Sequence, residues 1–221
     1  MTPEEILQRM YDETLTGNAP EVLDLTRQAL AMNMEPQSLL FDSLIPSLEE
    51  VGARFERGDF FVPEMLIAGR AMAGAMEVLR PLLAETGVQT IGKFLMGTVK
   101  GDVHDIGKNL VNIMLEGAGF EVIDLGVNVP PEKFVEQINE HEPDVVGMSA
   151  FLTTTMPMFK ANINAMEKAG VRDRVAVMVG GAPVTQEYAD AVGADGYSAD
   201  ASSAVKKAKD LIERRRSAVP A

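Results

Sequence analysis

Apolar side chains in the first part of the chain recur at the spacing of amphipathic helices. Ile6, Leu7 and Met10 form one such run, and apolar positions three and four residues apart share one face of a helix. Glycine and asparagine breaks, with prolines near the segment starts, divide this part into helices. They are predicted over Pro3–Leu15, Pro20–Met32, Pro36–Phe55 and Val62–Leu83. Their short connections favour a four-helix bundle, in which Pro46 should kink or break the third helix.

From residue 88 onward, short apolar runs alternate with amphipathic segments. Strands are predicted over Thr90–Val99, Glu121–Asp124, Val145–Ser149, Ala176–Val179 and Gly196–Tyr197. Helices are predicted over Asp105–Glu116, Pro131–Glu140, Met156–Ala169, Thr185–Val192 and Ala201–Arg214. Such alternation gives a parallel sheet with helices on both faces. The expected fold class is therefore α/β: a helical bundle cap over residues 1–87, then a flavodoxin-like, Rossmann-type sheet of five parallel strands over residues 88–221, in the order 2-1-3-4-5.

Composition and charge exclude several classes of function. The chain has 221 residues, a formal net charge of −13 and no cysteine. Binding to nucleic acid or to an anionic membrane needs a basic face, which this composition does not favour. No apolar stretch reaches the roughly 20 residues that span a bilayer, and the acidic N-terminus lacks the pattern of a signal peptide. We therefore expect a cytoplasmic protein without disulfides or thiolate metal sites.

The most distinctive chemistry lies in a glycine-bounded loop, whose residues are Gly101, Asp102, Val103, His104, Asp105, Ile106 and Gly107. The loop follows the first predicted strand and leads into a helix, and open α/β sheets bind ligands at such junctions. His104 is therefore well placed to be a metal ligand. A neutral imidazole ligand needs a partner that fixes its tautomer. Asp102, two residues earlier on the same side of an extended segment, can accept the other ring N–H.

Small residues end the third and fourth predicted strands. Ser149 closes the third strand, and Gly180 and Gly181 follow the fourth. Missing side chains allow a flat ligand to approach the backbone between the strand ends. The hydroxyls of Ser149, Thr153 and Thr155 can then bond polar edges of that ligand. Viewed alone, Gly180 and Gly181 are equally explained by a tight turn from strand to helix.

Three elements in this order resemble the cobalamin-binding signature shared by methionine synthase, the coenzyme-dependent mutases and the small corrinoid proteins of methyltransferase systems. They are Asp102-x-His104-x-x-Gly107, Ser149-x-Phe151-x-Thr153 and Gly180-Gly181. Residues 51–55 and 60–65 also resemble the helical cap that precedes this domain in methionine synthase and in corrinoid proteins. The resemblance covers the chain from about Thr2 to Arg214. Mutases lack such a cap directly before the motif, so the resemblance favours methyl transfer.

The resemblance implies a role for each matched residue. His104 would be the lower axial ligand of cobalt in place of the cofactor's own benzimidazole, an arrangement called base-off/His-on. Asp102 would bond the far nitrogen of His104, and Thr155 stands where methionine synthase has a serine, so these residues would form a proton relay. The other implied cofactor-binding positions are Gly101, Val103, Asp105, Ile106, Gly107, Ser149, Phe151, Thr153, Gly180, Gly181 and Ala201. Phe61 and Met65 are expected to cover the upper corrin face, although Met65 suits the bundle core equally well.

The implied function is that of a methyl carrier that is not catalytic on its own. Cobalamin would alternate between methylcobalamin and cob(I)alamin, and cobalt would perform the chemistry. The implied partners are a substrate:corrinoid methyltransferase, a second methyltransferase that passes the methyl group to a pterin or thiol, and a reductive activase. A cobalamin-binding sensor and the small subunit of a cobalamin-dependent mutase remain alternatives. A receiver-type signalling domain would need an aspartate at the end of the third strand, near Ser149.

Overall fold

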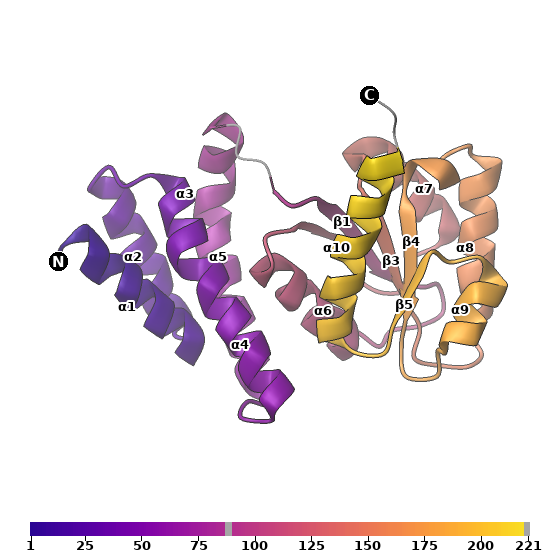
Figure 1. Ribbon diagram of the computed structural model, residues 1–221, viewed down its shortest axis with the longest axis horizontal. Helices are drawn as coiled ribbons and strands as arrows, with labels where there is room; N and C mark the ends of the chain where they lie inside the picture. The colour runs from indigo at the N-terminus through magenta and orange to yellow at the C-terminus, as the bar shows by residue number, and fades with distance from the viewer. Residues whose placement is uncertain (87–89, 219–221) are drawn as a thin grey trace. The chain divides into compact units, whose positions relative to one another are not determined.

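The computed structural model describes residues 1–86 and 90–218, which form two compact units (Figure 1). The first unit is helical, and the second, built on a sheet, begins at Thr90. The predicted boundary between residues 87 and 88 lies outside the described residues. Within the two described ranges, no helix is both long and apolar enough to cross a membrane.

Local signals in the sequence begin and end the helices of the first unit. These helices are α1 (Pro3–Thr16), α2 (Ala19–Ala31), α3 (Pro36–Leu39), α4 (Ile45–Arg57) and α5 (Val62–Thr86). The Thr2 hydroxyl accepts the N–H of Glu5, whose carboxylate accepts the N–H of Thr2, and this reciprocal capping box starts α1. Gly17 and Gly58 end α1 and α4 in left-handed conformations, with φ of 77° and 79°, which glycine adopts at little cost.

The third predicted helix is present but changes its pitch just before Pro46. Between α3 and α4 the chain makes a π-helical turn, Leu40–Leu44, and the N–H of Ile45 bonds the carbonyl of Leu40. Proline has no N–H and cannot continue the regular ladder of helical bonds, so the wider turn accommodates it. The proline therefore alters the helix without ending it. Helix α1 packs against α2, α4 and α5, and α5 also packs against α2 and α4, as expected for a bundle.

The second unit contains one parallel sheet with the predicted strand order. The strands are β1 (Lys93–Thr98), β2 (Glu121–Asp124), β3 (Val145–Ser149), β4 (Ala176–Gly180) and β5 (Gly196–Ser198). They lie in the order β2-β1-β3-β4-β5. The helices are α6 (Ile106–Gly117), α7 (Pro131–His141), α8 (Pro157–Lys168), α9 (Gln186–Val192) and α10 (Ala201–Ala218). β1 begins at Lys93 instead of Thr90, because its pairing with β2 starts at Lys93 and Glu121.

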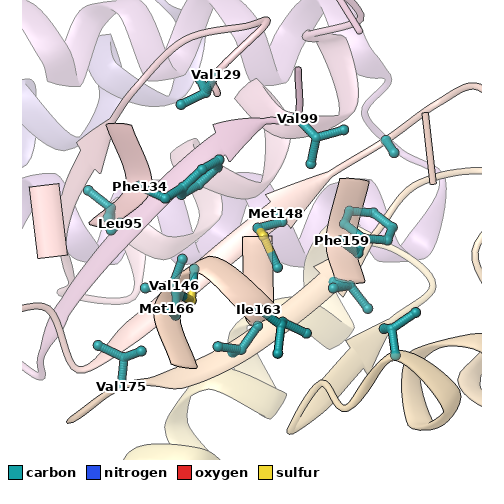
Figure 2. Close-up of a cluster of buried hydrophobic side chains, with 14 of the residues drawn as sticks. Leu95, Val99, Val129, Phe134, Val146, Met148, Phe159, Ile163, Met166 and Val175 are labelled. Atoms are coloured by element: carbon teal, nitrogen blue, oxygen red, sulfur yellow. The ribbon is translucent and has the colours of Figure 1, made fainter. Parts of the chain in front are cut away.

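The core that fixes the strand ends lies between the sheet and helices α7, α8 and α9. Leu95, Val146 and Met148 of the strands pack there with Phe134 of α7 and Phe159 of α8 (Figure 2). Alternate strand residues face the other side of the sheet, and α10 packs against β3, β4 and β5 (Figure 1). Burying one large apolar side chain contributes roughly 1.5–3 kcal/mol. This cluster therefore holds the strands, and the loops at their carboxyl ends, in a fixed register.

Candidate functional site

The histidine loop, residues 99–105, connects β1 to α6 at the carboxyl edge of the sheet. Gly101 has φ of 85°, a conformation in which most side chains are strained. The N–H of Asp102 closes the turn on the carbonyl of Val99 at 3.1 Å. Asp102 is fully buried beyond this turn, whereas Val103 and His104 are exposed. A buried carboxylate and an exposed imidazole thus stand two residues apart on one loop.

One oxygen of Asp102 holds the imidazole of His104. Oδ1 lies 2.7 Å from Nδ1 of the ring, and it also accepts the backbone N–H of His104 at 3.1 Å. An ionised carboxylate only accepts hydrogen bonds, so Nδ1 carries the ring proton and Nε2 keeps a free lone pair. Among the described residues, none hydrogen-bonds Nε2. The His104 side chain is 45% exposed, and it therefore offers one nitrogen donor to a metal.

The other oxygen of Asp102 is bonded by the segment that follows β3. Oδ2 accepts the N–H of Phe151 at 2.8 Å, the N–H of Leu152 at 3.2 Å and the hydroxyl of Thr155 at 2.7 Å. The Thr155 hydroxyl also lies 2.8 Å from the carbonyl oxygen of Leu152. It has a single hydrogen, and the charged carboxylate is the stronger acceptor. Thr155, Asp102 and His104 therefore form a continuous hydrogen-bonded chain.

The charge of Asp102 follows from these contacts. Burial disfavours the carboxylate, but hydrogen bonds from Thr155, from the ring and backbone of His104 and from the Phe151 backbone outweigh burial. Together they hold the pKa of Asp102 well below its usual range. The side chain is thus ionised at neutral pH. A carboxylate on the far nitrogen fixes the tautomer and orientation of an imidazole ligand and raises its basicity.

An aromatic ring contacts the exposed imidazole, and further exposed apolar side chains lie on the same two segments of the chain. The ring of Phe151 stacks on that of His104, with centroids 4.4 Å apart and planes inclined by 28°. Val103 and Ile106 are 69% and 62% exposed, and Leu152 is 40% exposed. Exposed apolar side chains that gather in one place indicate a binding surface, whereas isolated ones do not. This apolar surface suits a broad, flat and largely apolar group.

The small residues at the neighbouring strand ends share this edge of the sheet. Ser149 pairs in register with Thr98 of β1 and with Gly180 of β4. Gly181 has φ of 134°, and a Cβ there would lie 1.9 Å from the carbonyl oxygen of Ala150. The protein's own backbone therefore requires this glycine. At Gly180 a Cβ would approach no atom closer than 3.4 Å, so the absence of a side chain leaves space at the sheet edge.

The remaining candidate residues take up varied positions. Exposed positions are Asp105 in the histidine loop, Gly107 in α6 and Thr153 after β3. Ala201 is buried as the first residue of α10. In the helical unit, Phe61 is 66% exposed just before α5, whereas Met65 is fully buried. Burial of Met65 agrees with the core interpretation that the sequence left open.

Sequence reasoning missed the groups that support the histidine loop from outside. Asn128, after β2, accepts the N–H of Gly101 through Oδ1 at 2.8 Å and donates its own N–H to the carbonyl of Asp102 at 2.9 Å. Lys108 on α6 is only 2% exposed, and its ammonium contacts Asp124 Oδ2 at 2.5 Å. Two signals were available in the sequence. One was a lysine beside the apolar positions of a helix, and the other was an asparagine, which tolerates left-handed backbone, in a connecting loop.

Both units match known protein domains. Residues 92–206 match a family model described as a B12 binding domain, and residues 6–80 match a second model with the same description. The dimethylamine corrinoid protein of Methanosarcina barkeri is 42% identical over 96% of this chain and 100% of its own length. The chain belongs to the corrinoid proteins. Trimethylamine corrinoid protein 1 of Methanosarcina acetivorans is 38% identical over 95% of this chain and 98% of its own.

Two solved structures confirm the predicted fold of this corrinoid protein. A cobalamin-binding protein from Desulfitobacterium hafniense has a TM-score of 0.67 and 32% identity, over 96% of this chain and 98% of its own. A chain of the methanol:cobalamin methyltransferase complex MtaBC from Methanosarcina barkeri has a TM-score of 0.83 and 27% identity, over 95% of this chain and 80% of its own. The predicted arrangement, a helical part followed by a Rossmann-type sheet, is therefore correct.

Cobalamin is the cofactor that proteins of this family bind, and the residues of the site fit it. In residues 1–86 and 90–218, no three histidine, cysteine, aspartate or glutamate side chains gather where they could hold a bare metal ion. A corrin would itself supply most of the ligands of its cobalt, so a single donor from the protein would be enough. Nε2 of His104 could be that donor, and the stacked Phe151 and the exposed apolar side chains of the same segments would suit the apolar face of a corrin ring.

Proposed function

We propose that this corrinoid protein is a methyl carrier in which His104 ligates cobalt in the base-off/His-on arrangement. The observation that carries the proposal is the 2.7 Å hydrogen bond between Asp102 Oδ1 and His104 Nδ1. This bond leaves Nε2 as the lone-pair donor on the exposed side of the ring. The stacked ring of Phe151 supports the role, because it limits rotation of the imidazole. The displaced cofactor tail would lie along the strand ends, at Ser149 and Gly180.

Cobalamin, when bound, supplies a metal centre that accepts a methyl group from a donor and releases it to a nucleophile. The chain's own residues hold and adjust the axial ligand. Asp102 keeps a negative charge beside Nδ1 and so strengthens Nε2 as a donor. The Thr155 hydroxyl remains hydrogen-bonded to the Asp102 carboxylate. His104 would hold the metal through Nε2, and Asp102 would neutralise a positive charge on the imidazole whenever Nε2 carries a proton in place of the metal. Metal ligation and proton uptake would therefore compete for the same nitrogen of His104.

Methylamines are the proposed source of the methyl group. Relatives named for dimethylamine and trimethylamine match at 42% and 38% identity over nearly the whole chain, whereas the chain from the methanol complex matches at 27%. We infer a loading methyltransferase that acts on a methylamine. A second methyltransferase would pass the methyl group to a thiol or a pterin, and a reductive activase would restore the carrier after oxidation of cobalt.

Phe61 is the proposed apolar cover for the upper face of the corrin. The residue is 66% exposed, while its backbone N–H is held by the carboxylate of Glu64 at 3.0 Å. The preceding residue, Phe60, lies under the guanidinium of Arg54, 5.1 Å from the ring centroid. The turn before α5 thus presents an exposed aromatic ring on a fixed backbone. Met65 is fully buried and is assigned to the bundle core.

Reconstitution with hydroxocobalamin tests the axial ligand. Protein that contains ¹⁵N-labelled histidine is loaded, freed of unbound cofactor and reduced to the cobalt(II) state, and its paramagnetic resonance spectrum is recorded. We expect a nitrogen doublet from the labelled imidazole. His104→Ala should abolish the doublet, and His141→Ala, at the second of the two histidines, should preserve it. Wild-type protein that retains no corrin, or that shows the triplet of the cofactor's own unlabelled base, would contradict the proposal.

Methylation by candidate partners tests the donor. Loaded carrier in the cobalt(I) state is mixed with methyltransferases for monomethylamine, dimethylamine, trimethylamine or methanol, each with its substrate. Formation of methylcobalamin is followed by visible absorbance. We expect the fastest methylation with a methylamine enzyme. Methylation by the methanol enzyme alone would overturn the proposed donor and leave the assignment of the axial ligand intact.

A further inference from the structure

The segment that follows β2, residues 125–129, runs beside the end of β1 and the start of the histidine loop. The N–H of Leu125 bonds the carbonyl of Met96 at 2.8 Å, and the N–H of Thr98 bonds the carbonyl of Gly126 at 2.9 Å. The N–H of Val129 bonds the carbonyl of Thr98 at 2.9 Å. The segment is therefore tied to β1 through the backbone on both sides of residues 127 and 128.

Asn128 joins this segment to the histidine loop by two hydrogen bonds. Its Oδ1 accepts the N–H of Gly101 at 2.8 Å, and its own N–H donates to the carbonyl of Asp102 at 2.9 Å. The backbone of Asn128 is left-handed, with φ of 56°. Asparagine adopts this conformation more readily than other residues with a side chain. The side-chain amide and the unusual backbone angle together allow one residue to bond two successive positions of the loop.

A second set of contacts holds the same segment from the side of α6. The buried ammonium of Lys108 contacts Oδ2 of Asp124, and Oδ1 of Asp124 accepts the N–H of Gly126 at 2.9 Å. Thr98, whose N–H bonds Gly126, donates its hydroxyl to the carbonyl of His104 at 3.0 Å. Asn128 therefore projects from a segment that is itself fixed to β1 and α6.

We propose that Asn128 is a positioning residue for the cobalt ligand. This inference rests on the proposed function, because it takes Nε2 of His104 as the axial donor. The Asp102 carboxylate fixes the rotation of the imidazole ring. The backbone of Gly101 and Asp102 fixes the position from which the side chains of Asp102 and His104 extend. Residue 101 is a glycine, and glycine has wider backbone freedom than any other residue type. Without the Asn128 amide oxygen, the peptide N–H of Gly101 has no fixed partner and this peptide can rotate. His104 then would no longer be held at a fixed distance from a metal on its exposed side.

Asn128→Gly removes the amide oxygen and keeps the left-handed backbone accessible. Asn128→Asp keeps an oxygen acceptor at the same place. The matched control is Asn33→Gly, because Asn33 is another asparagine with left-handed backbone, φ of 58°, and it lies in the helical unit. The affinity for cobalt(II) cobalamin is measured by equilibrium dialysis. The fraction of bound cofactor with histidine ligation is measured from the ¹⁵N doublet, which a loss of general stability would not change in folded protein.

We expect Asn128→Gly to weaken cobalamin binding about threefold to tenfold, as for the loss of one modest hydrogen bond, and to yield a mixture of histidine-ligated and unligated cofactor. Asn128→Asp and Asn33→Gly should stay within about twofold of wild type and fully ligated. A fully ligated Asn128→Gly variant with wild-type affinity would overturn the inference. If that variant does not fold, Asn128→Lys, which offers no acceptor, takes its place with the same criteria. A wild-type protein without the doublet would instead overturn the proposed function.

Discussion

Gly181 and Ala150 approach so closely that a Cβ on the glycine would lie 1.9 Å from the alanine carbonyl oxygen. The N–H of Ala150 also donates to the carbonyl of Gly180 at 3.1 Å, so the two strand ends are locked together at this point. The sequence left open whether the glycine pair makes room for a ligand or only forms a tight turn. The contact explains Gly181 by packing within the protein. Gly180 is the member of the pair at which space remains.

Gly181→Ala should destabilise the apoprotein by about 3 kcal/mol or prevent folding, because a clash with backbone adds to strain at positive φ. Gly170→Ala is the control. Gly170 has φ of 70°, but a Cβ there would meet no atom within 4 Å, so only strain of about 1–2 kcal/mol is expected. Urea unfolding of both variants measures the difference. Equal losses of unfolding free energy in the two variants would show that the carbonyl of Ala150 can move away from the new Cβ without loss of stability.

Thr155→Val should lower the stability of the apoprotein by about 1–2 kcal/mol, because it removes a hydrogen bond to a charged group and keeps the shape of the side chain. Thr155 is buried and bonds Asp102 at 2.7 Å. Thr155→Ser keeps the hydroxyl and should lose less than the valine variant. The free energy of unfolding in urea at neutral pH decides between them. A valine variant as stable as wild type would mean that the hydrogen bond from Thr155 to Asp102 contributes no net stability.

The low pKa of Asp102 predicts a particular response to acid. The pKa in the folded protein lies below its value in the unfolded chain. The carboxylate therefore contributes stability that is complete above about pH 4 and is lost as pH falls through the folded-state pKa. Thr155→Val should raise the pKa of Asp102 in the folded protein. The free energy of unfolding should then decrease less steeply as pH falls. Parallel curves for wild type and Thr155→Val below about pH 5 would contradict this assignment.

Lys108→Met removes a buried ammonium from the side chain of Asp124. Asp124 is 38% exposed, so water replaces part of the lost partner, and we expect a loss of about 1–2 kcal/mol. Lys133→Met removes an exposed lysine that pairs with Glu136 and should cost less than about 0.5 kcal/mol. Both values come from urea unfolding of apoprotein. A cost at Lys108 no greater than that at Lys133 would show that the buried pair does not support the fold.

Much of the fold could be predicted because it depends on periodicity and handedness. Helical spacing before residue 87 and the alternation of apolar runs after it separate the two kinds of architecture. The handed crossover rule then limits the order of five parallel strands, and the order with β1 between β2 and β3 is the observed one. The contact between Asp102 and His104 is also local, because the residues are two positions apart on one loop.

Residue patterns mark a lysine among apolar helix positions and an asparagine in a connecting loop, but they do not predict what these residues contact, because the contacts join distant positions. Asn128 is 27 residues from Gly101, and its bond depends on one left-handed backbone angle. Lys108 lies on a helix, where lysine usually faces water, and its burial depends on Asp124 at the end of another element. The turn before Pro46 is a further case. Proline forbids a regular helical bond but does not determine whether the helix breaks, kinks or widens.

One oxygen of Asp102 bonds His104 within the histidine loop, and the other bonds the backbone of Phe151, which is 49 residues from Asp102 in the chain. A peptide cut from around the glycine-bounded motif would contain the imidazole and its carboxylate. It would lack the donors of Phe151, Leu152 and Thr155 that keep the carboxylate charged once it is removed from water. The motif therefore does not keep its charged, buried carboxylate outside this fold. Grafting it onto another scaffold requires grafting the start of a second loop along with it.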